Sequence, residues 1–426
     1  MTFFSDPLHD EFASVVLGFA PYGGGDVGEI QAIARAMKDG DDGSYFDAFV
    51  TYARRRIDEG NSAAANGHRE SAHDCYLRAA ALLGMAYHPL YGTPVDPRLA
   101  DAFHLQMDTF DRAMALLDPP GEKLEIPYEG TTLPAYFLRA HGHATEVRPT
   151  IIISDGWDST FVESYLEMGV AALRRGYHVL VHDGPGQGRL LIDEGLPLRH
   201  DWEKVVTPVV DAALAIDVVD QDRVVYEACS LGGYFAPRVA AYEPRLAAVI
   251  ADPGQFDVGV KIFQMMKMLG LDDAAVARLP AIDPEHEKKI MTAIGSNRRA
   301  RWTIVQRGFW TNGAADLRSY LAEMSKWKLE PDEVAAIRCP TFVAAAESDP
   351  VSSNAKDLYD ALACPKTFRE FSDADGAGMH CEQLNRSLAN RVFLDWLDDT
   401  LHMHRRTTGA ATADVRPKRL RAGEIP

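Results

Sequence analysis

The chain has 426 residues, of which 46% are hydrophobic and 25% charged, so two or three domains with a large buried core are expected. The 62 acidic residues outnumber the 44 basic ones, and the formal net charge of −18 argues against a nucleic-acid partner because phosphates would be repelled. The five cysteines include no CxxC pair, so neither a disulfide framework nor a metal site is expected. The N-terminal segment lacks the basic start and apolar stretch of a secretory signal, and no apolar run approaches the ~20 residues of a membrane span. We therefore expect a cytoplasmic protein without membrane contact.

Helical periodicity dominates the first part of the chain. Residues 45–59, 70–87 and 97–117 carry apolar side chains at three- and four-residue spacing. This pattern predicts an N-terminal helical domain over residues 1–122.

An alternating pattern begins at residue 124. The segment LEIPYEGTTLPAYFLRA predicts a hairpin with its turn at Glu129 and Gly130. From residue 149, the short apolar runs PTIIIS, HVLVHDG, RVVYEAC, AAVIADPG and PTFVAAAES alternate with helical stretches. Alternating strands and helices predict an α/β fold with a mostly parallel sheet.

One interval interrupts this alternation. Residues 257–337 have helical periodicity and no convincing strand, which predicts a helical cap inserted between two core segments, residues 123–256 and 338–402. The final segment, residues 403–426, is basic and poor in large apolar residues, so we expect a flexible tail.

A candidate nucleophile lies between a predicted strand and a predicted helix. In VVYEACSLGGY, Ser230 is surrounded by small residues, as in a nucleophile elbow, where a serine occupies a sharp, strained turn. The turn leaves the N–H of Leu231 at a helix N-terminus as a candidate oxyanion donor. Ala228 replaces the first glycine of the usual G-x-S-x-G pattern. Cys229 is an alternative nucleophile, but we expect its side chain to point away from the site.

A serine hydroxyl needs a base, and the base needs an orienting acid. The strand PTFVAAAES ends at Asp349, which we expect to be the acid, with Glu347 as the alternative. His380 follows the last predicted strand on a glycine-rich loop and precedes the final helix, so we expect it to be the base.

The loop after the first core strand predicts a second oxyanion donor. In SDGWDST, Gly156 allows the backbone to turn and the N–H of Trp157 is the candidate. Ser159 is expected to cap the following helix, a role also open to Asp158. The string HDGPGQG at residues 182–188 lacks the spacing and the lysine of a phosphate loop, so a tight turn at the rim of the site is expected instead.

Several longer strings resemble one known family: DGWDST, HDGPGQG, DWEKVVTPVVD, SLGGYFAPRVAAYEPRLAAVIADPGQFD and GAGMHCE. They are similar to the α/β-hydrolases related to 2,6-dihydroxypseudooxynicotine hydrolase and to the fungal polyketide-shortening hydrolases, and the resemblance runs from about residue 45 to residue 401. It implies an α/β-hydrolase fold with a helical N-terminal domain over the active site and, as in some members, a homodimer. It assigns the triad to Ser230, Asp349 and His380 and the oxyanion hole to Leu231 and Trp157. His182 stands where the family usually has an aromatic residue, and this departure, like Ala228, bears on substrate shape.

Several members of this family hydrolyse carbon–carbon bonds next to a ketone. The resemblance therefore implies hydrolysis of such a bond, or of an ester or amide, in a bulky aromatic or polyketide-like small molecule, without a metal or organic cofactor. Two alternatives stay open: an acyltransferase or cyclase with the same triad, and a non-catalytic binding protein of the same fold. Four side chains are expected to contact the substrate, although core packing explains each of them equally well: Tyr76, Met265, Phe309 and Trp310.

Overall fold

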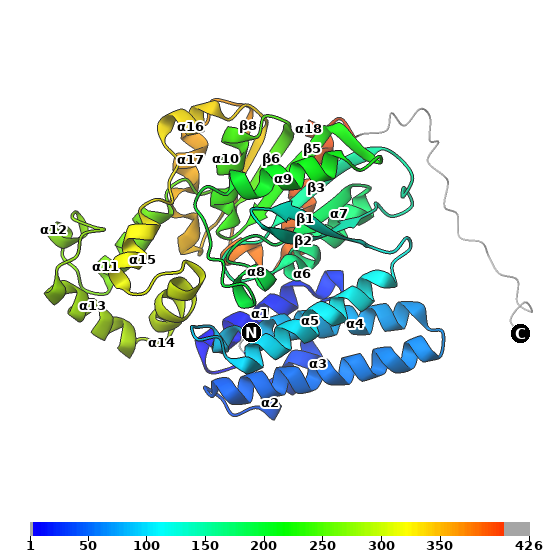
Figure 1. Cartoon of the computed structure of the whole chain (residues 1–426), viewed down its shortest axis with the longest axis horizontal. Coiled ribbons are helices and arrows are strands. Elements are labelled where there is room, and N and C mark those ends of the chain that lie inside the picture. The colour runs from blue at the N-terminus through cyan, green and yellow to red at the C-terminus, as the bar shows by residue number, and fades with distance from the viewer. Residues whose placement is uncertain (1–2, 404–426) are drawn as a thin grey trace, which may run out of the picture.

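The computed structural model describes residues 3–403. An eight-stranded sheet lies at its centre, with helices on both faces, a bundle of N-terminal helices below it and a helical cap at its left in Figure 1. The predicted α/β class with a mostly parallel sheet is thereby confirmed. The predicted tail lies, except for Met403, outside the described residues.

The sheet has the strand order β1-β2-β4-β3-β5-β6-β7-β8. Strand β2 pairs antiparallel with β1 and β4, and all other neighbours are parallel. Glu129 and Gly130 form the predicted hairpin turn, with φ of 37° and 90°, since a two-residue turn that matches the sheet twist needs positive φ. The strands are β1 (Glu122–Tyr128), β2 (Thr131–Leu138), β3 (Arg148–Ser154), β4 (His178–His182), β5 (Val219–Cys229), β6 (Leu246–Asp252), β7 (Thr341–Ala346) and β8 (Lys366–Phe371).

Both faces of the sheet are buried because the central strands are apolar throughout. Side chains alternate between the faces: Ile152 belongs to one core cluster, whereas Ile151 and Ile153 belong to the other. Helices α9 (Glu203–Leu214), α10 (Gly232–Tyr242) and α17 (Ala355–Ala361) cover the first face. The second face is covered by α6 (Phe161–Ser164), the π-helical turn η3 (Tyr165–Gly169), α7 (Val170–Arg175) and α18 (Arg386–Thr400).

The N-terminal region is helical, as its periodicity predicts. The three predicted helices correspond to α3 (Asp42–Ala65), α4 (Arg69–Ala86) and α5 (Pro97–Ala115). Two further helices, α1 (Pro7–Gly18) and α2 (Val27–Ala36), precede them. Their start signals are present in the sequence, since the Asp6 side chain accepts from the first backbone N–H groups of α1 and Pro7 begins that helix.

The interval from residue 257 to 337 contains only helices and one isolated bridge, between Asp257 and Lys328. Its elements are α11 (Val258–Met268), α12 (Asp273–Val276), α13 (Pro284–Ser296), α14 (Arg298–Ala300), the π-helix η4 (Arg301–Phe309), α15 (Leu317–Met324) and α16 (Pro331–Ala336). This cap touches the N-terminal helices as well as the core. Arg299 pairs with Glu11 of α1 at 2.8 Å, and the Trp302 indole N–H donates to the carbonyl of His88 at 2.8 Å.

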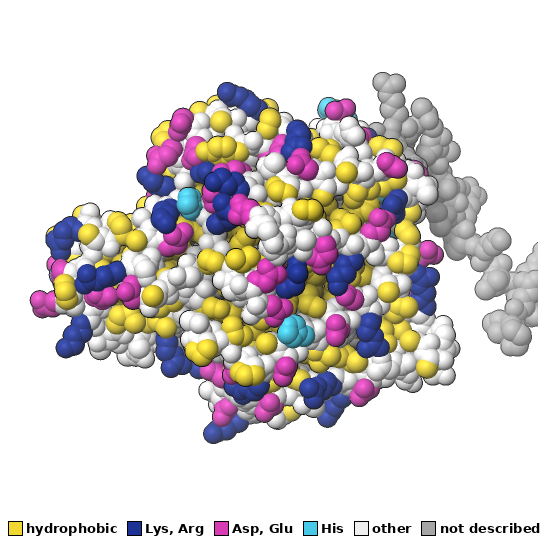
Figure 2. Space-filling view, viewed as in Figure 1, with side chains coloured by type: hydrophobic (Ala, Val, Ile, Leu, Met, Phe, Trp, Pro, Cys, Tyr) yellow, Lys and Arg dark blue, Asp and Glu magenta, His cyan; other side chains and the backbone are white. Residues whose placement is uncertain are grey.

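On the face in Figure 2, basic and acidic side chains are interspersed without an extended basic area. Within residues 3–403, no helix combines the length and the apolar character that a membrane crossing requires.

Candidate active site

Ser230 lies directly after strand β5, on a turn of unusual backbone conformation. Its φ is 61°, a left-handed value that costs a non-glycine residue about 1–3 kcal/mol and is kept only where the surroundings hold it. The Ser230 N–H donates to the Asp252 carbonyl at 2.7 Å, and the Gln255 side chain donates to the Ser230 carbonyl at 2.7 Å. These two bonds hold the serine between the ends of strands β5 and β6.

The small residues around Ser230 are required by close packing. A Cβ at Gly232 would lie 2.7 Å from the Cβ of Ala228, and a Cβ at Gly233 would overlap the Pro253 carbonyl oxygen. Helix α10 can therefore begin beside the strand only if both positions are glycine. The glycine at 232 also makes room for the methyl group of Ala228, the departure from the usual motif.

The structure brings the three predicted triad residues together, although 150 residues separate the serine from the histidine. His380 Nε2 lies 2.9 Å from Ser230 Oγ, and His380 Nδ1 lies 2.8 Å from Asp349 Oδ2. With Nδ1 protonated toward the carboxylate, Nε2 can accept the serine proton. Ser230 and His380 remain partly accessible to solvent, whereas the Asp349 side chain is almost fully buried.

The electrostatics suit a histidine base and an ionised acid. Burial disfavours the charged form of His380, but the Asp349 carboxylate, with a smaller contribution from Cys381, outweighs burial and raises the pKa of the imidazole well above its usual value. Burial likewise opposes the charged form of Asp349, yet the bonds and charge of His380 lower the pKa of that carboxyl. The Val351 N–H, which donates to Asp349 Oδ1 at 2.8 Å, supports the same ionised form.

The alternatives for nucleophile and acid lie elsewhere. The Cys229 thiol points to Glu167 Oε1, 3.1 Å away, and burial raises its pKa well above the usual value, so it stays a thiol. Glu347 is exposed and accepts from the backbone N–H of Asp373 at 2.8 Å. It braces the loop that leads to the histidine and has no bond with the imidazole among the described residues.

The expected oxyanion donors belong to two neighbouring loops. Within residues 3–403, neither the N–H of Leu231 nor the N–H of Trp157 has a hydrogen-bond acceptor. Gly156 brings the two loops together: a Cβ there would lie 2.7 Å from the Cβ of Ser230 and 2.8 Å from the nitrogen of Leu231. Such free N–H groups can stabilise negative charge that develops on a carbonyl oxygen.

The predicted tight turn HDGPGQG supports the loop of residues 155–159, which we call the oxyanion loop after its proposed donor, Trp157. The Gln187 side chain donates to the carbonyls of Asp155 and Gly156 at 2.9 and 2.7 Å. His182 bonds Ser154 Oγ at 2.7 Å, and burial lowers the pKa of His182 to about 4, so it is neutral. The motif therefore holds the loop in place, which is a structural role rather than phosphate binding.

The cap also contacts the oxyanion loop. The Trp157 indole N–H donates to Thr311 Oγ1 at 2.6 Å, and the Arg307 guanidinium lies 4.5 Å from the centre of the Trp157 ring. Arg307 also pairs with Asp158 at 3.0 Å, and the Tyr91 hydroxyl donates to the Asp158 carbonyl at 2.8 Å. Three regions far apart in sequence thus meet at this loop. We call these contacts to Trp157 and Asp158 the oxyanion-loop clamp.

Helix α6 is capped differently from the expectation. Thr160, not Ser159, accepts from the helix N–H of Val162, and Thr160 and Glu163 form a capping box. Asp158 is engaged with Arg307 instead. Sequence reasoning missed this ion pair because the residues near Arg307 resemble those of an exposed helix. Nothing in that segment indicates Asp158 as a partner.

The four expected substrate contacts are placed unequally. Tyr76 is a correction: its ring packs on Gly60 of α3 and its hydroxyl bonds Asn61 at 3.0 Å, so it is a packing residue of the helical bundle. Phe309 is buried in the cap against Tyr320. The other two remain predicted substrate contacts. Trp310 packs edge-on against Tyr91 of the clamp, with ring centres 5.1 Å apart, and Met265 is partly exposed on α11.

Sequence reasoning also missed two basic residues next to the triad, the half-buried Lys261 and the buried Arg386. Lys261 of α11 donates to Gln255 Oε1 at 3.0 Å and to the carbonyl of Val351 in the Asp349 loop, and burial lowers its pKa to about 7. Arg386 of α18 joins the histidine loop to strand β6, bonding the Cys381 carbonyl at 2.7 Å and Asp252 at 2.9 Å. Basic residues in amphipathic helices gave no signal of either role.

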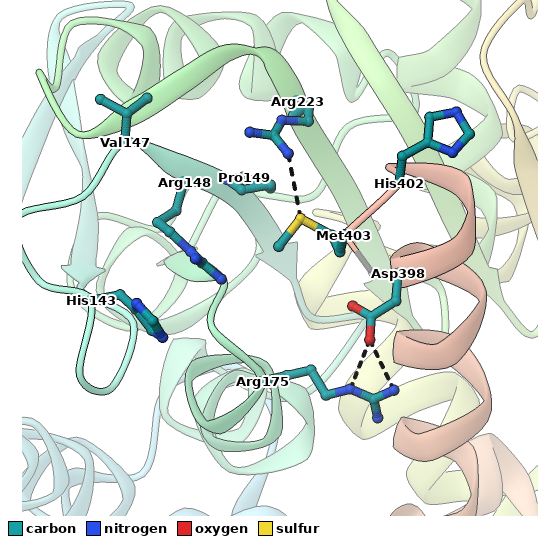
Figure 3. Close-up of a pocket in the computed structure, with 9 residues that line it drawn as sticks. All are labelled: His143, Val147, Arg148, Pro149, Arg175, Arg223, Asp398, His402 and Met403. Atoms are coloured by element: carbon teal, nitrogen blue, oxygen red, sulfur yellow. Dashed lines mark hydrogen bonds and ion pairs between the residues drawn. The ribbon is translucent and has the colours of Figure 1, made fainter. Parts of the chain in front are cut away.

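A cavity of about 430 Å³ lies away from these residues, at the opposite end of the strands (Figure 3). Its basic side chains already have partners: Arg175 pairs with Asp398 at 3.0 Å, and Arg148 donates to the Gly176 carbonyl at 2.7 Å. Because these basic side chains are already paired, we do not interpret the cavity as an anion-binding site. In the part of the chain that the structure describes, no His, Cys, Asp and Glu group is arranged to hold a metal ion.

Known proteins share both the sequence and the fold. A sequence model of the "Alpha/beta hydrolase family" matches residues 136–390. "Hydrolase LUC6" from Fusarium sp is 30% identical over 417 residues, which cover 92% of this chain and 96% of the relative. "20-hydroxy-prefusarin hydrolase FUS2" from Gibberella moniliformis is 29% identical over 429 residues, covering 95% and 98%.

Solved structures give the same picture. The crystal structure of 2,6-dihydroxy-pseudo-oxynicotine hydrolase superposes with a TM-score of 0.70 at 23% identity, covering 90% of this chain and 95% of that one. AbyA5 wildtype has a TM-score of 0.63 at 18% identity, covering 88% and 90%. The resemblance that the motifs indicated is thereby confirmed; at these identities the structural likeness concerns the fold.

Proposed function

Because the chain belongs to the α/β-hydrolase family, we propose that it is a serine hydrolase whose triad is Ser230, His380 and Asp349. The observation that carries this proposal is the continuous pair of hydrogen bonds, 2.9 and 2.8 Å, that runs from the serine through the imidazole to the carboxylate. The free N–H groups of Leu231 and Trp157 beside the serine support an oxyanion hole.

The proposed reaction is acyl transfer to water. His380 Nε2 takes the Ser230 proton as Oγ adds to a carbonyl carbon, and Asp349 holds the imidazole and stabilises its charged form. The N–H groups of Leu231 and Trp157 bind the developing oxyanion. His380 then protonates the leaving group, and a water activated by the same nitrogen hydrolyses the acyl-enzyme. The partly accessible imidazole supports water as the acceptor, in preference to an acyltransferase or cyclase.

We propose a carbon–carbon bond next to a ketone, or an ester, in a bulky aromatic or polyketide-like molecule as the bond that is cleaved. The names of two similar proteins support this class: 20-hydroxy-prefusarin hydrolase, which is similar in sequence, and 2,6-dihydroxy-pseudo-oxynicotine hydrolase, which is similar in fold. The aromatic side chains around the oxyanion loop, Tyr91, Trp302 and Trp310, suit such a substrate.

A fluorophosphonate probe tests the proposal directly, because it reacts only with an activated serine. We expect stoichiometric labelling of the wild-type chain and none of Ser230→Ala or His380→Ala. Ser296→Ala, which changes an exposed serine at the end of α13, should label normally. A folded wild-type chain that does not react would favour a non-catalytic binding protein. A homodimer and a cytoplasmic location stay predictions that sedimentation and cell fractionation would check.

A further inference from the structure

Arg307 carries more hydrogen-bonding capacity than its neighbours use. A guanidinium has five N–H donors. One nitrogen, Nη1, pairs with Asp158 at 3.0 Å, whereas Nε is buried without a partner. Within residues 3–403, no other hydrogen bond to this side chain is present. Unused donors on an enclosed cation are costly unless a ligand or water takes them up.

The guanidinium is also held in a fixed orientation. It lies 4.5 Å from the ring centre of Trp157 and 5.0 Å from that of Trp302, an arrangement that stacking and cation–π attraction stabilise. Its side chain is 16% exposed, so a ligand can reach part of it. The group is thus rigid, charged and accessible, as a binding residue needs to be.

Arg307 contacts the oxyanion loop at two neighbouring residues, since it stacks on Trp157 and pairs with Asp158. Burial opposes the charged form of Asp158, but Arg307, then His88 and more weakly His380 lower the pKa of that carboxyl. Burial raises the pKa of Glu11, whose carboxyl likewise feels the charges of His380 and Arg307. The imidazole and the guanidinium therefore act on the same two carboxylates. Because Arg307 stacks on the ring of Trp157, it packs on the residue whose backbone N–H is the proposed oxyanion donor.

We propose that Arg307 binds the second carbonyl oxygen of a 1,3-dicarbonyl substrate and stabilises it as an enolate when the carbon–carbon bond breaks. This inference rests on the proposed serine hydrolase and narrows its substrate class. An ester has no oxygen at that position, since its leaving oxygen is attached to the carbonyl carbon under attack. Beyond its part in the clamp, which serves both reactions, Arg307 thus favours carbon–carbon cleavage over ester cleavage.

The chemistry balances without a co-reactant other than water. Ser230 Oγ bonds to the first carbonyl carbon, and collapse of the adduct breaks the bond from that carbon to the central carbon. The bonding pair moves onto the second carbonyl as an enolate, whose oxygen the guanidinium holds. His380 returns the serine proton to the central carbon and releases a ketone. Water then hydrolyses the acyl-enzyme to a carboxylic acid.

Two substrates with the same acyl group distinguish a role of Arg307 in binding the enolate from a loss of activity toward all substrates. The hydrolysis of 1-phenylbutane-1,3-dione at its acetyl carbonyl and the hydrolysis of phenyl acetate both pass through an acetyl-enzyme. Only the diketone, however, expels an enolate as its leaving group. Arg307→Met loosens the clamp for both substrates, and it should lower kcat/KM for the diketone about 10–100-fold more than for the ester, which corresponds to the loss of one charged hydrogen bond. Arg307→Lys keeps the charge without the planar fork and should fall between.

Two further variants complete the design. Thr311→Val removes the acceptor of the Trp157 indole and loosens the clamp without touching the guanidinium, so it should slow both substrates alike. Arg301→Met removes an exposed cation from the same helix and should change neither. Equal losses for both substrates in Arg307→Met would overturn the proposal. So would a wild-type chain that labels with fluorophosphonate and cleaves the ester but not the diketone, an outcome that leaves the serine hydrolase intact. No labelling at all would instead refute the proposed function.

Discussion

Replacing Gly156 by alanine should disable the chemistry while leaving the fold in place. The added Cβ would lie 2.7 Å from the Cβ of Ser230, 2.8 Å from the nitrogen of Leu231 and 2.9 Å from the Cys229 carbonyl oxygen. Carbon contacts are at rest near 3.5–4.0 Å, so the loop has to retreat by ~0.8 Å or more. Trp157, the next residue, moves with it. An oxyanion donor works only at about 2.7–3.1 Å, and losing one costs about 10²–10³ in kcat.

The assay compares phenyl acetate hydrolysis with thermal unfolding of the same preparations. Gly156→Ala should lose about 10²–10³ in kcat, because the added methyl group presses on the nucleophile turn and displaces the Trp157 N–H. Gly295→Ala in the cap is the matched control, since nothing lies within 4 Å of its Cβ, and it should keep full activity. If Gly156→Ala hydrolyses the ester at nearly the wild-type rate, the loop is not held against Leu231 as described and the reasoning fails.

Three further predictions concern the base, the elbow and a buried cation. The kcat/KM should fall as the pH drops below the raised pKa of His380, because the base must be neutral, so the acid limb of the pH profile lies above about 6.5. Asp349→Asn removes the charge that raises this pKa, so the acid limb of the pH profile should move to lower pH while kcat drops by about 10⁴. An acid limb that moves to higher pH would contradict the assignment of Asp349 as the acid of the triad. Gly232→Ala should lower the free energy of unfolding by about 1–3 kcal/mol through its contact with Ala228, and Ala228→Gly in the same chain should restore most of it, as measured by a double-mutant cycle in urea. Arg386→Met leaves a buried carboxylate unpaired and should cost about 3–5 kcal/mol in the same unfolding assay; an unchanged midpoint would show that the pair does not matter.

Much of the sheet and the three triad residues could be predicted because their signals are local. Continuous apolar runs mark strands buried on both faces, and Glu129–Gly130 marks a turn that needs positive φ. Ser230 is set by the small residues on either side of it, and the histidine and acid follow strands in a fixed order. Each of these features depends on a few neighbouring residues, so the sequence alone reveals them.

The surroundings of the triad could not be predicted because they depend on contacts between distant segments. Arg307 meets Asp158 only when the cap folds back over the core, and neither residue shows this in its own neighbourhood. Tyr76 shows the opposite error: an aromatic residue on a helix near the site was expected to face the substrate, but the close approach of Gly60 draws it into the helical bundle. Side-chain direction on a helix follows from packing partners that periodicity does not identify.

The oxyanion-loop clamp has a consequence for how this protein can change. The N-terminal region supplies Tyr91 and the cap supplies Arg307 and Thr311, so both hold the loop that carries the proposed oxyanion donor Trp157. Exchanging the cap for that of a relative would therefore alter rate as well as preference. New selectivity in this architecture has to arise by single substitutions that spare the clamp, rather than by wholesale replacement of a module.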